Sequence, residues 1–64
     1  MNNYQEAIVE LRLKLNVSQV GLAKLLGVSF SSVNRWETGK HEPTKIAKVK
    51  LSKLFKEYDI KFDF

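Results

Sequence analysis

The chain has 64 residues, which is room for one small domain and excludes two domains with a cleft between them. It has no cysteine and only one histidine, His41, so disulfides, thiolate metal sites and metal sites built from several imidazoles are excluded. Lysine and arginine number 11 against 7 acidic residues, and the net charge of +4 is compatible with a polyanionic partner. No apolar run has the length of a membrane span and the first residues lack a signal-peptide pattern, so a cytoplasmic protein is expected.

The first predicted element is a helix from Asn3 to Leu15. Asn3 followed in the next turn by Glu6 is the pattern of a capping box. Apolar side chains then recur at the spacing of one helical face, namely Tyr4, Ile8, Leu11 and Leu15.

A second helix is predicted from its N-cap Ser18 to Leu26, and Gly27 stands where a left-handed C-terminal cap belongs. Gly21 lies inside this helix and is expected to destabilise it by ~0.5–1 kcal/mol relative to alanine. The side chains expected to face the core are Leu22, Ala23, Leu25 and Leu26.

A third helix is predicted after the N-cap Ser29, ending near Glu37. Val33 and Trp36 point to one side of it, and we expect Trp36 to be a core residue rather than a stacking platform. The opposite arc carries Phe30, Ser31, Asn34 and Arg35. A small residue, Ala23, at the contact of two helices and a glycine in the short turn between them are typical of a helix-turn-helix whose second helix is presented outward.

A fourth helix, or two helices with a bend, is predicted from the cap Thr44 to about Tyr58. Its inward stripe is Ala47, Leu51, Leu54, Phe55 and Tyr58. Residues 40–56 hold six lysines and one glutamate. The later lysines, which form either a solvated helix face or a second contact with a polyanion, are Lys48, Lys50, Lys53 and Lys56.

The last residues, 59–64, alternate polar and apolar side chains, which is a strand pattern. A lone strand is not stable, so this segment must pair with another strand or fray. We therefore expect a helical domain over residues 1–58 and a separate tail over residues 59–64.

The segments Ser18–Ser29 and Val33–Lys40, followed by Pro43, resemble the Cro/XRE helix-turn-helix family of phage repressors and bacterial regulators. The resemblance covers about residues 7–55 and departs from the family at Val20 and Gly21, where acidic residues are usual. It implies an all-α, four- to five-helix, lambda-repressor-like domain. It also implies specific binding to duplex DNA, with the third helix in the major groove.

The resemblance places four side chains of the third helix at base-reading positions. Arg35 can form a bidentate pair with guanine, and Ser31 can donate or accept. Asn34 can bond either an adenine edge or a phosphate. Phe30 can contact a thymine methyl group or fold back onto the protein surface.

The family also contacts the DNA backbone, and Gln19 in the first turn of the second helix matches such a position. The other matching positions are Ser18, Ser32, Thr38, Lys40 and Lys45. Arg12 and Glu37 match a partly buried ion pair that orients the third helix in relatives, although two unpaired surface charges are the alternative.

Relatives bind palindromic operators as dimers, so a homodimer is expected at least on DNA. Its contact is formed either by the tail, through Ile60, Phe62 and Phe64, or by Ile46 and Val49 on the fourth helix.

The resemblance favours a small sequence-specific transcriptional regulator, a repressor in particular, of bacterial or phage origin. Two alternatives stay open: an antitoxin-like regulator with a toxin partner, and a helix-turn-helix used only for protein–protein contact. No carboxylate pair, nucleophile–base pair or phosphate-cradling loop indicates an enzyme, and no cofactor or metal ion is expected.

Overall fold

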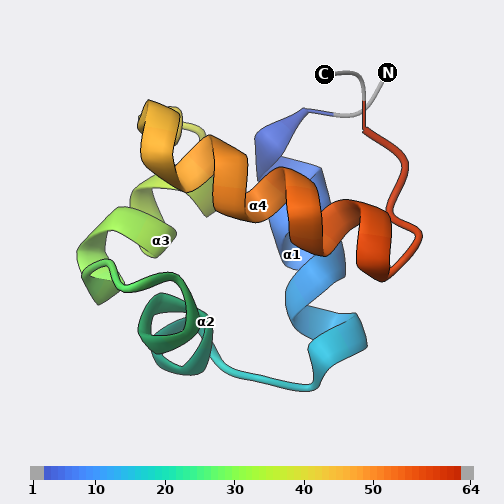
Figure 1. Ribbon diagram of the computed structural model, residues 1–64. Helices are drawn as coiled ribbons and strands as arrows, with labels where there is room; N and C mark the ends of the chain where they lie inside the picture. Colours follow the sequence, from blue (N-terminus) through green and yellow to red (C-terminus); the bar gives the residue numbers. More distant parts are fainter. Residues whose placement is uncertain (1–2, 63–64) are drawn as a thin grey trace.

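The computed structural model describes residues 3–62, which fold into four α-helices (Figure 1). The helices are α1 (Tyr4–Leu15), α2 (Gln19–Leu26), α3 (Phe30–Glu37) and α4 (Lys45–Glu57). The described residues contain no strand. The predicted all-α class is therefore confirmed, and the region of the fourth helix is one continuous helix without a bend.

Each helix begins at a short polar side chain that accepts a hydrogen bond from a backbone N–H of the first turn. In α1, for example, the side-chain oxygen of Asn3 accepts from the N–H of Glu6 at 2.9 Å. Such a cap contributes about 1 kcal/mol to the stability of its helix. All four sequence-predicted caps are confirmed, namely Asn3, Ser18, Ser29 and Thr44.

The turn between α2 and α3 depends on Gly27, whose φ of 71° lies in the left-handed region. This conformation lets the N–H of Val28 reach back to the carbonyl of Ala23 at 3.0 Å, which closes the end of α2. A side chain would be strained at this φ, so glycine permits the abrupt change of direction into α3.

Gly21, inside α2, lies close to Val17 in the preceding segment. A Cβ added at Gly21 would stand 3.1 Å from the Cβ of Val17, which itself packs against the core. The absent side chain therefore makes room for Val17, and this contact offsets part of the helix-propensity loss that the sequence predicts at Gly21.

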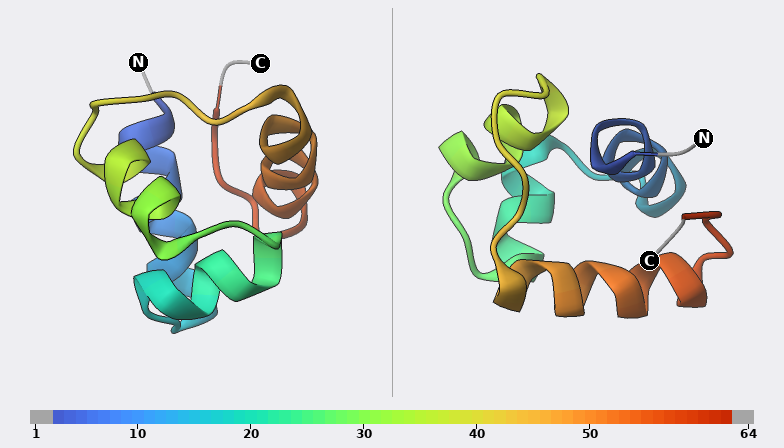
Figure 2. Two further views of the ribbon diagram at one scale, coloured as in Figure 1. Left: turned by 90° about the vertical axis from the view of Figure 1, so that its left-hand side faces the viewer. Right: turned by 90° about the horizontal axis from the view of Figure 1, so that it is seen from above.

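The core is shared by all four helices and the segment that follows them. α3 packs against both α1 and α2, and α4 packs against α1 and α2 (Figures 1 and 2). The buried hydrophobic side chains of this core are Ala7, Ile8, Leu11, Leu22, Ala23, Leu26, Val33, Trp36, Ala47, Leu51, Phe55 and Ile60. Because α3 contributes Val33 and Trp36 to this core, its opposite side faces away from the protein.

Leu25 was expected to face the core, and this prediction is wrong, because its side chain is 59% exposed. Leu22, Leu26 and Ala23 already span the inward arc of α2. At 100° per residue, Leu25 lies about 60° outside that arc, on the far side of Leu22. A run of apolar residues in a two-turn helix therefore does not bury every member.

The segment after α4 does not form the expected strand within residues 59–62, so that prediction is wrong there. Asp59 adopts a φ of 56°, and the next N–H, of Ile60, donates to the carbonyl of Phe55 at 2.7 Å. Ile60 is buried, and the ring of Phe62 lies 4.4 Å from that of Tyr4. Alternating apolar residues arise here because an extended segment covers the core of its own chain. Phe64 lies outside the described residues.

Candidate nucleic-acid interface

The outward face of α3 is accessible along its length. Ser31 and Arg35 are exposed, and the side chain of Phe30 is 48% exposed. Asn34 is half-buried. In the left view of Figure 2, α3 lies toward the viewer, with α2 below it. The structure therefore brings the four sequence-predicted base-reading residues to one open surface.

Asn34 is half-buried because it bonds to α2. Its side-chain Nδ2 donates to Oε1 of Gln19 at 3.4 Å, and Nε2 of Gln19 donates to Oε1 of Glu37 at 2.9 Å. Asn34, which the sequence predicts to read a base, and Gln19, which it predicts to contact phosphate, are thus hydrogen-bonded to each other. Sequence reasoning missed this connection, since it depends on the crossing of α2 and α3.

Glu37 and Arg12 form the ion pair that the resemblance implies. Nε of Arg12 donates to Oε2 of Glu37 at 2.8 Å, and Nη2 donates to Oε1 at 3.1 Å. The Glu37 side chain is only 7% exposed, and this hydrogen bonding raises the pKa of Arg12 above its ordinary value. The pair links the end of α3 to α1, while Nη1 of Arg12 reaches the carbonyl of Val17 at 3.5 Å.

The hydroxyl groups expected to contact phosphate are engaged within the chain. Ser18 caps α2, and the hydroxyl of Ser32 lies 3.0 Å from that of Ser29. The hydroxyl of Thr38 donates to the carbonyl of Arg35 at 3.2 Å. A hydroxyl has one donor and two acceptor positions, so each group retains capacity for a further partner.

Among the residues that the structure describes, three cations on or near α3 have no protein partner. Arg35, Lys40 and Lys45 are exposed, and none has an ion pair or a side-chain hydrogen bond to another residue in the range 3–62. Lys40 lies in the turn that follows α3, and Lys45 is the first residue of α4. These cations are available to neutralise an external anion.

Two lysines of the predicted lysine face on α4 are used inside the fold. Nζ of Lys50 donates to the carbonyl of Leu26, at the end of α2, at 3.0 Å. A cation there satisfies a free carbonyl and opposes the negative end of the helix dipole. Nζ of Lys48 pairs with Glu42 at 3.0 Å. Both lysines thus have a partner within the fold, although Lys50 is exposed and the Lys48 side chain is 38% exposed.

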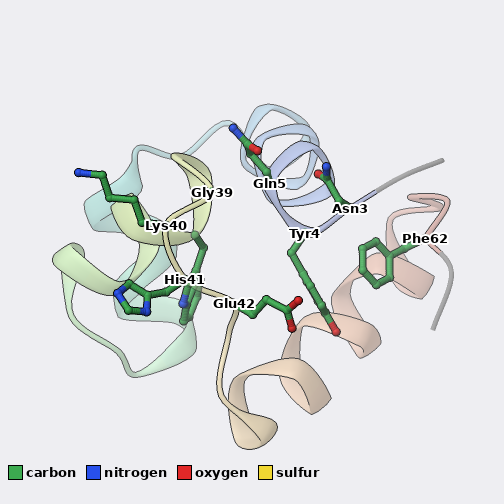
Figure 3. A pocket seen from close by; sticks show the side chains of 9 residues that line it. Asn3, Tyr4, Gln5, Gly39, Lys40, His41, Glu42 and Phe62 are labelled. Atoms are coloured by element: carbon green, nitrogen blue, oxygen red, sulfur yellow. The ribbon is translucent and has the colours of Figure 1, made fainter.

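A pocket of about 430 Å³ lies where the start of α1, the turn after α3 and the tail meet. Of the residues that line it, Figure 3 shows Lys40 and His41 at the left, Tyr4 and Phe62 at the right and Glu42 between them. His41 is exposed, and the Glu42 carboxylate is already paired with Lys48. Within residues 3–62 no cluster of three or more histidine, aspartate or glutamate side chains is arranged to hold a metal ion.

Comparison with known proteins gives one clear result. A family model described as helix-turn-helix matches residues 8–63, most of the chain and the whole of α2 and α3. No curated protein and no solved structure matches. Among the described residues, none of the helices combines the length and the apolar character that crossing a membrane requires.

Proposed function

This chain belongs to the Cro/XRE-type helix-turn-helix family of DNA-binding regulators, and from this premise we propose that it is a small transcriptional repressor that binds a specific duplex sequence. It acts in the cytoplasm of a bacterium or of a phage-infected cell, with α3 in the major groove of its operator. No catalytic step is part of this function.

The observation that carries the proposal is the open outward face of α3. Its polar side chains Ser31 and Arg35 are exposed, while Val33 and Trp36 hold the same helix in the core. Such a helix is rigid and presents donors and acceptors at a spacing that base edges can meet. Its one exposed aromatic residue, Phe30, supplies an apolar surface for a thymine methyl group.

Contacts with phosphate would surround this face and fix its register on the duplex. Gln19 stands in the first turn of α2, where free backbone N–H groups favour an anion. The ammonium groups of Lys40 and Lys45, which have no partner within residues 3–62, supply positive charge beyond the other end of α3. Ser18, Ser32 and Thr38 complete the proposed set with their hydroxyl groups.

We further propose that two copies bind a palindromic operator through α4. Ile46 is 73% exposed and Val49 is 57% exposed, one turn apart on the same helix. In the other candidate contact, the tail, Ile60 and Phe62 already pack against the core of their own chain. The exposed pair on α4 is therefore the better-supported dimer contact.

The function is tested by selecting bound sequences from a random duplex pool. We expect one enriched motif, palindromic if the dimer forms, and an affinity that falls steeply with rising salt. Absence of any enriched motif, together with equal affinity for all duplexes, would contradict sequence-specific regulation. Absence of any salt-dependent binding would leave protein–protein contact as the function.

The dimer is tested separately by analytical ultracentrifugation of the DNA complex. The double variant Ile46→Lys, Val49→Lys should bind a half-site as one copy and lose cooperative binding to the full palindrome. An unchanged mass of the complex would exclude this surface as the dimer contact.

A further inference from the structure

In the hydrogen bonds that link α3 to α2, the chemistry of the side chains determines which group donates and which accepts. A carboxylate only accepts hydrogen bonds, and the Glu37 carboxylate accepts two from Arg12. The side chain of Gln19 must therefore turn its NH₂ group toward Glu37, as the 2.9 Å bond shows. Its carbonyl oxygen is then left facing Asn34.

The same reasoning determines the orientation of the Asn34 side-chain amide. An oxygen faces it from Gln19, so Asn34 must offer its NH₂ group there, at 3.4 Å. Its own oxygen, Oδ1, lies on the other side of the planar amide. No buried side-chain oxygen or nitrogen among the described residues lacks a partner, and Oδ1 bonds to none of those residues. This oxygen is therefore open to solvent.

We propose that Glu37, acting through Gln19, fixes the orientation of the Asn34 amide, so that its oxygen faces the base and Asn34 selects adenine. This inference rests on the proposed function and adds the preference at one position of the operator. Asn34 presents an accepting oxygen, which suits the exocyclic amine of adenine or cytosine. Its second N–H remains for the N7 acceptor that adenine places beside that amine, whereas cytosine has no such acceptor.

Gln19 is thus a positioning residue for Asn34 as well as a candidate phosphate contact. If its amide were free to rotate, the Asn34 amide could present either its oxygen or its nitrogen to the groove. An Asn34 amide that can present either its oxygen or its NH₂ group would bind purines and pyrimidines with little preference. The Glu37 carboxylate, acting through Gln19, would in this way restrict which base pair is accepted.

The experiment begins with the duplex selection described above, applied to the wild-type chain and to Asn34→Ala. The position whose preference disappears in Asn34→Ala is the one that Asn34 reads. Four duplexes differing only at that base pair are then compared by competition binding, with preference given as a ratio of affinities. These ratios are insensitive to a uniform loss of phosphate contact.

Three further variants distinguish a change in the orientation of the Asn34 amide from a general loss of protein stability. Gln19→Leu breaks the link and leaves the Arg12–Glu37 pair in place, and Glu37→Gln replaces the acceptor-only group by an amide. Arg12→Gln is the matched control, because it also breaks the ion pair but keeps the carboxylate. Thermal melting of each variant establishes that it is folded.

We expect the wild-type chain and Arg12→Gln to prefer adenine by about tenfold, and the other two variants by about twofold or less. Preference at the base pair read by Arg35 should stay unchanged in all of them. Retention of the adenine preference in Gln19→Leu, or no position affected by Asn34→Ala, would overturn the inference while leaving the regulator intact. Failure of the proposed function differs, since the selection would then enrich no motif at all.

Discussion

The outward faces of α3 and α4 both carry cations, yet the structure uses them differently. On α4, Lys48 pairs with Glu42 and Lys50 bonds to the end of α2. On α3, the single cation, Arg35, has no partner among the described residues. Part of the positive charge of α4 is therefore already paired within the fold, whereas the cation of α3 is not.

This difference shows that charge density and binding capacity are separate properties. A lysine that already bonds to a carboxylate or a helix end has part of its charge offset and one of its three donors in use, so it offers less to a phosphate. A free guanidinium on a rigid helix loses only its hydration and some side-chain freedom. We therefore expect the accessible but sparsely charged face of α3 to be the better interface for DNA, and the predictions below test this.

The largest effect is expected at Arg35. Arg35→Ala removes a bidentate contact and should weaken discrimination at one base pair by about 1–3 kcal/mol. Competition binding with single-base-pair variants of the selected operator measures it. Lys53→Ala, an exposed lysine on α4, is the matched control and should leave every preference unchanged. An even loss over all sequences in Arg35→Ala would show that Arg35 does not read a base.

Lys50 should matter for stability instead. Lys50→Met removes the bond to the carbonyl of Leu26 and the cation at the end of α2, and should lower the free energy of unfolding by about 1 kcal/mol. Urea denaturation measures this, with Lys53→Met as control at less than about 0.5 kcal/mol. The base preferences of the folded variant should not change. Equal stability of the two variants would mean that the lysine bond contributes nothing.

Lys40 should affect binding in a way that does not depend on sequence. Lys40→Ala removes one phosphate contact, so operator and scrambled duplexes should lose affinity by the same small factor. The slope of log affinity against log salt concentration should decrease in magnitude by about 1. Affinity measured at four or five salt concentrations tests both points. A loss confined to the operator would assign Lys40 a base contact.

The smallest effect concerns Lys48. The hydrogen bond with Glu42 raises the pKa of the Lys48 ammonium group above its ordinary value. A raised pKa in the folded state means that the pairing stabilises the fold at pH values below the ordinary lysine range. That contribution is lost as the pH rises through the raised pKa. In an NMR titration, Glu42→Gln should bring the pKa of Lys48 down toward its usual value, and an unchanged pKa would contradict the pairing.

Most of the fold could be predicted from the sequence because its signals are local. Caps such as Asn3 and Thr44 act on the next turn of their own helix, and the left-handed Gly27 acts on its immediate neighbours. Helical periodicity places Val33 and Trp36 in the core for the same reason. These features need no knowledge of which helix packs against which.

The errors and omissions depend on contacts between distant segments. The burial of Ile60 requires that the tail turn back onto α4 and α1, and an alternating pattern looks the same in a strand. The bond from Lys50 to Leu26 requires that α4 pass beside the end of α2. The link from Asn34 to Gln19 depends on the angle at which α3 crosses α2. Neither spacing nor composition specifies such distances.

The ring contact between Tyr4 and Phe62, at 4.4 Å, brings the first helix and the tail together at one end of the molecule (Figure 1). A short peptide linker between Asn3 and Phe62 could therefore make the backbone of the described residues circular. Such a closed chain has fewer unfolded conformations, so it should withstand heat better than the linear chain. In Figure 1 this end of the molecule lies away from α2, so cyclisation would leave α2 clear of the junction.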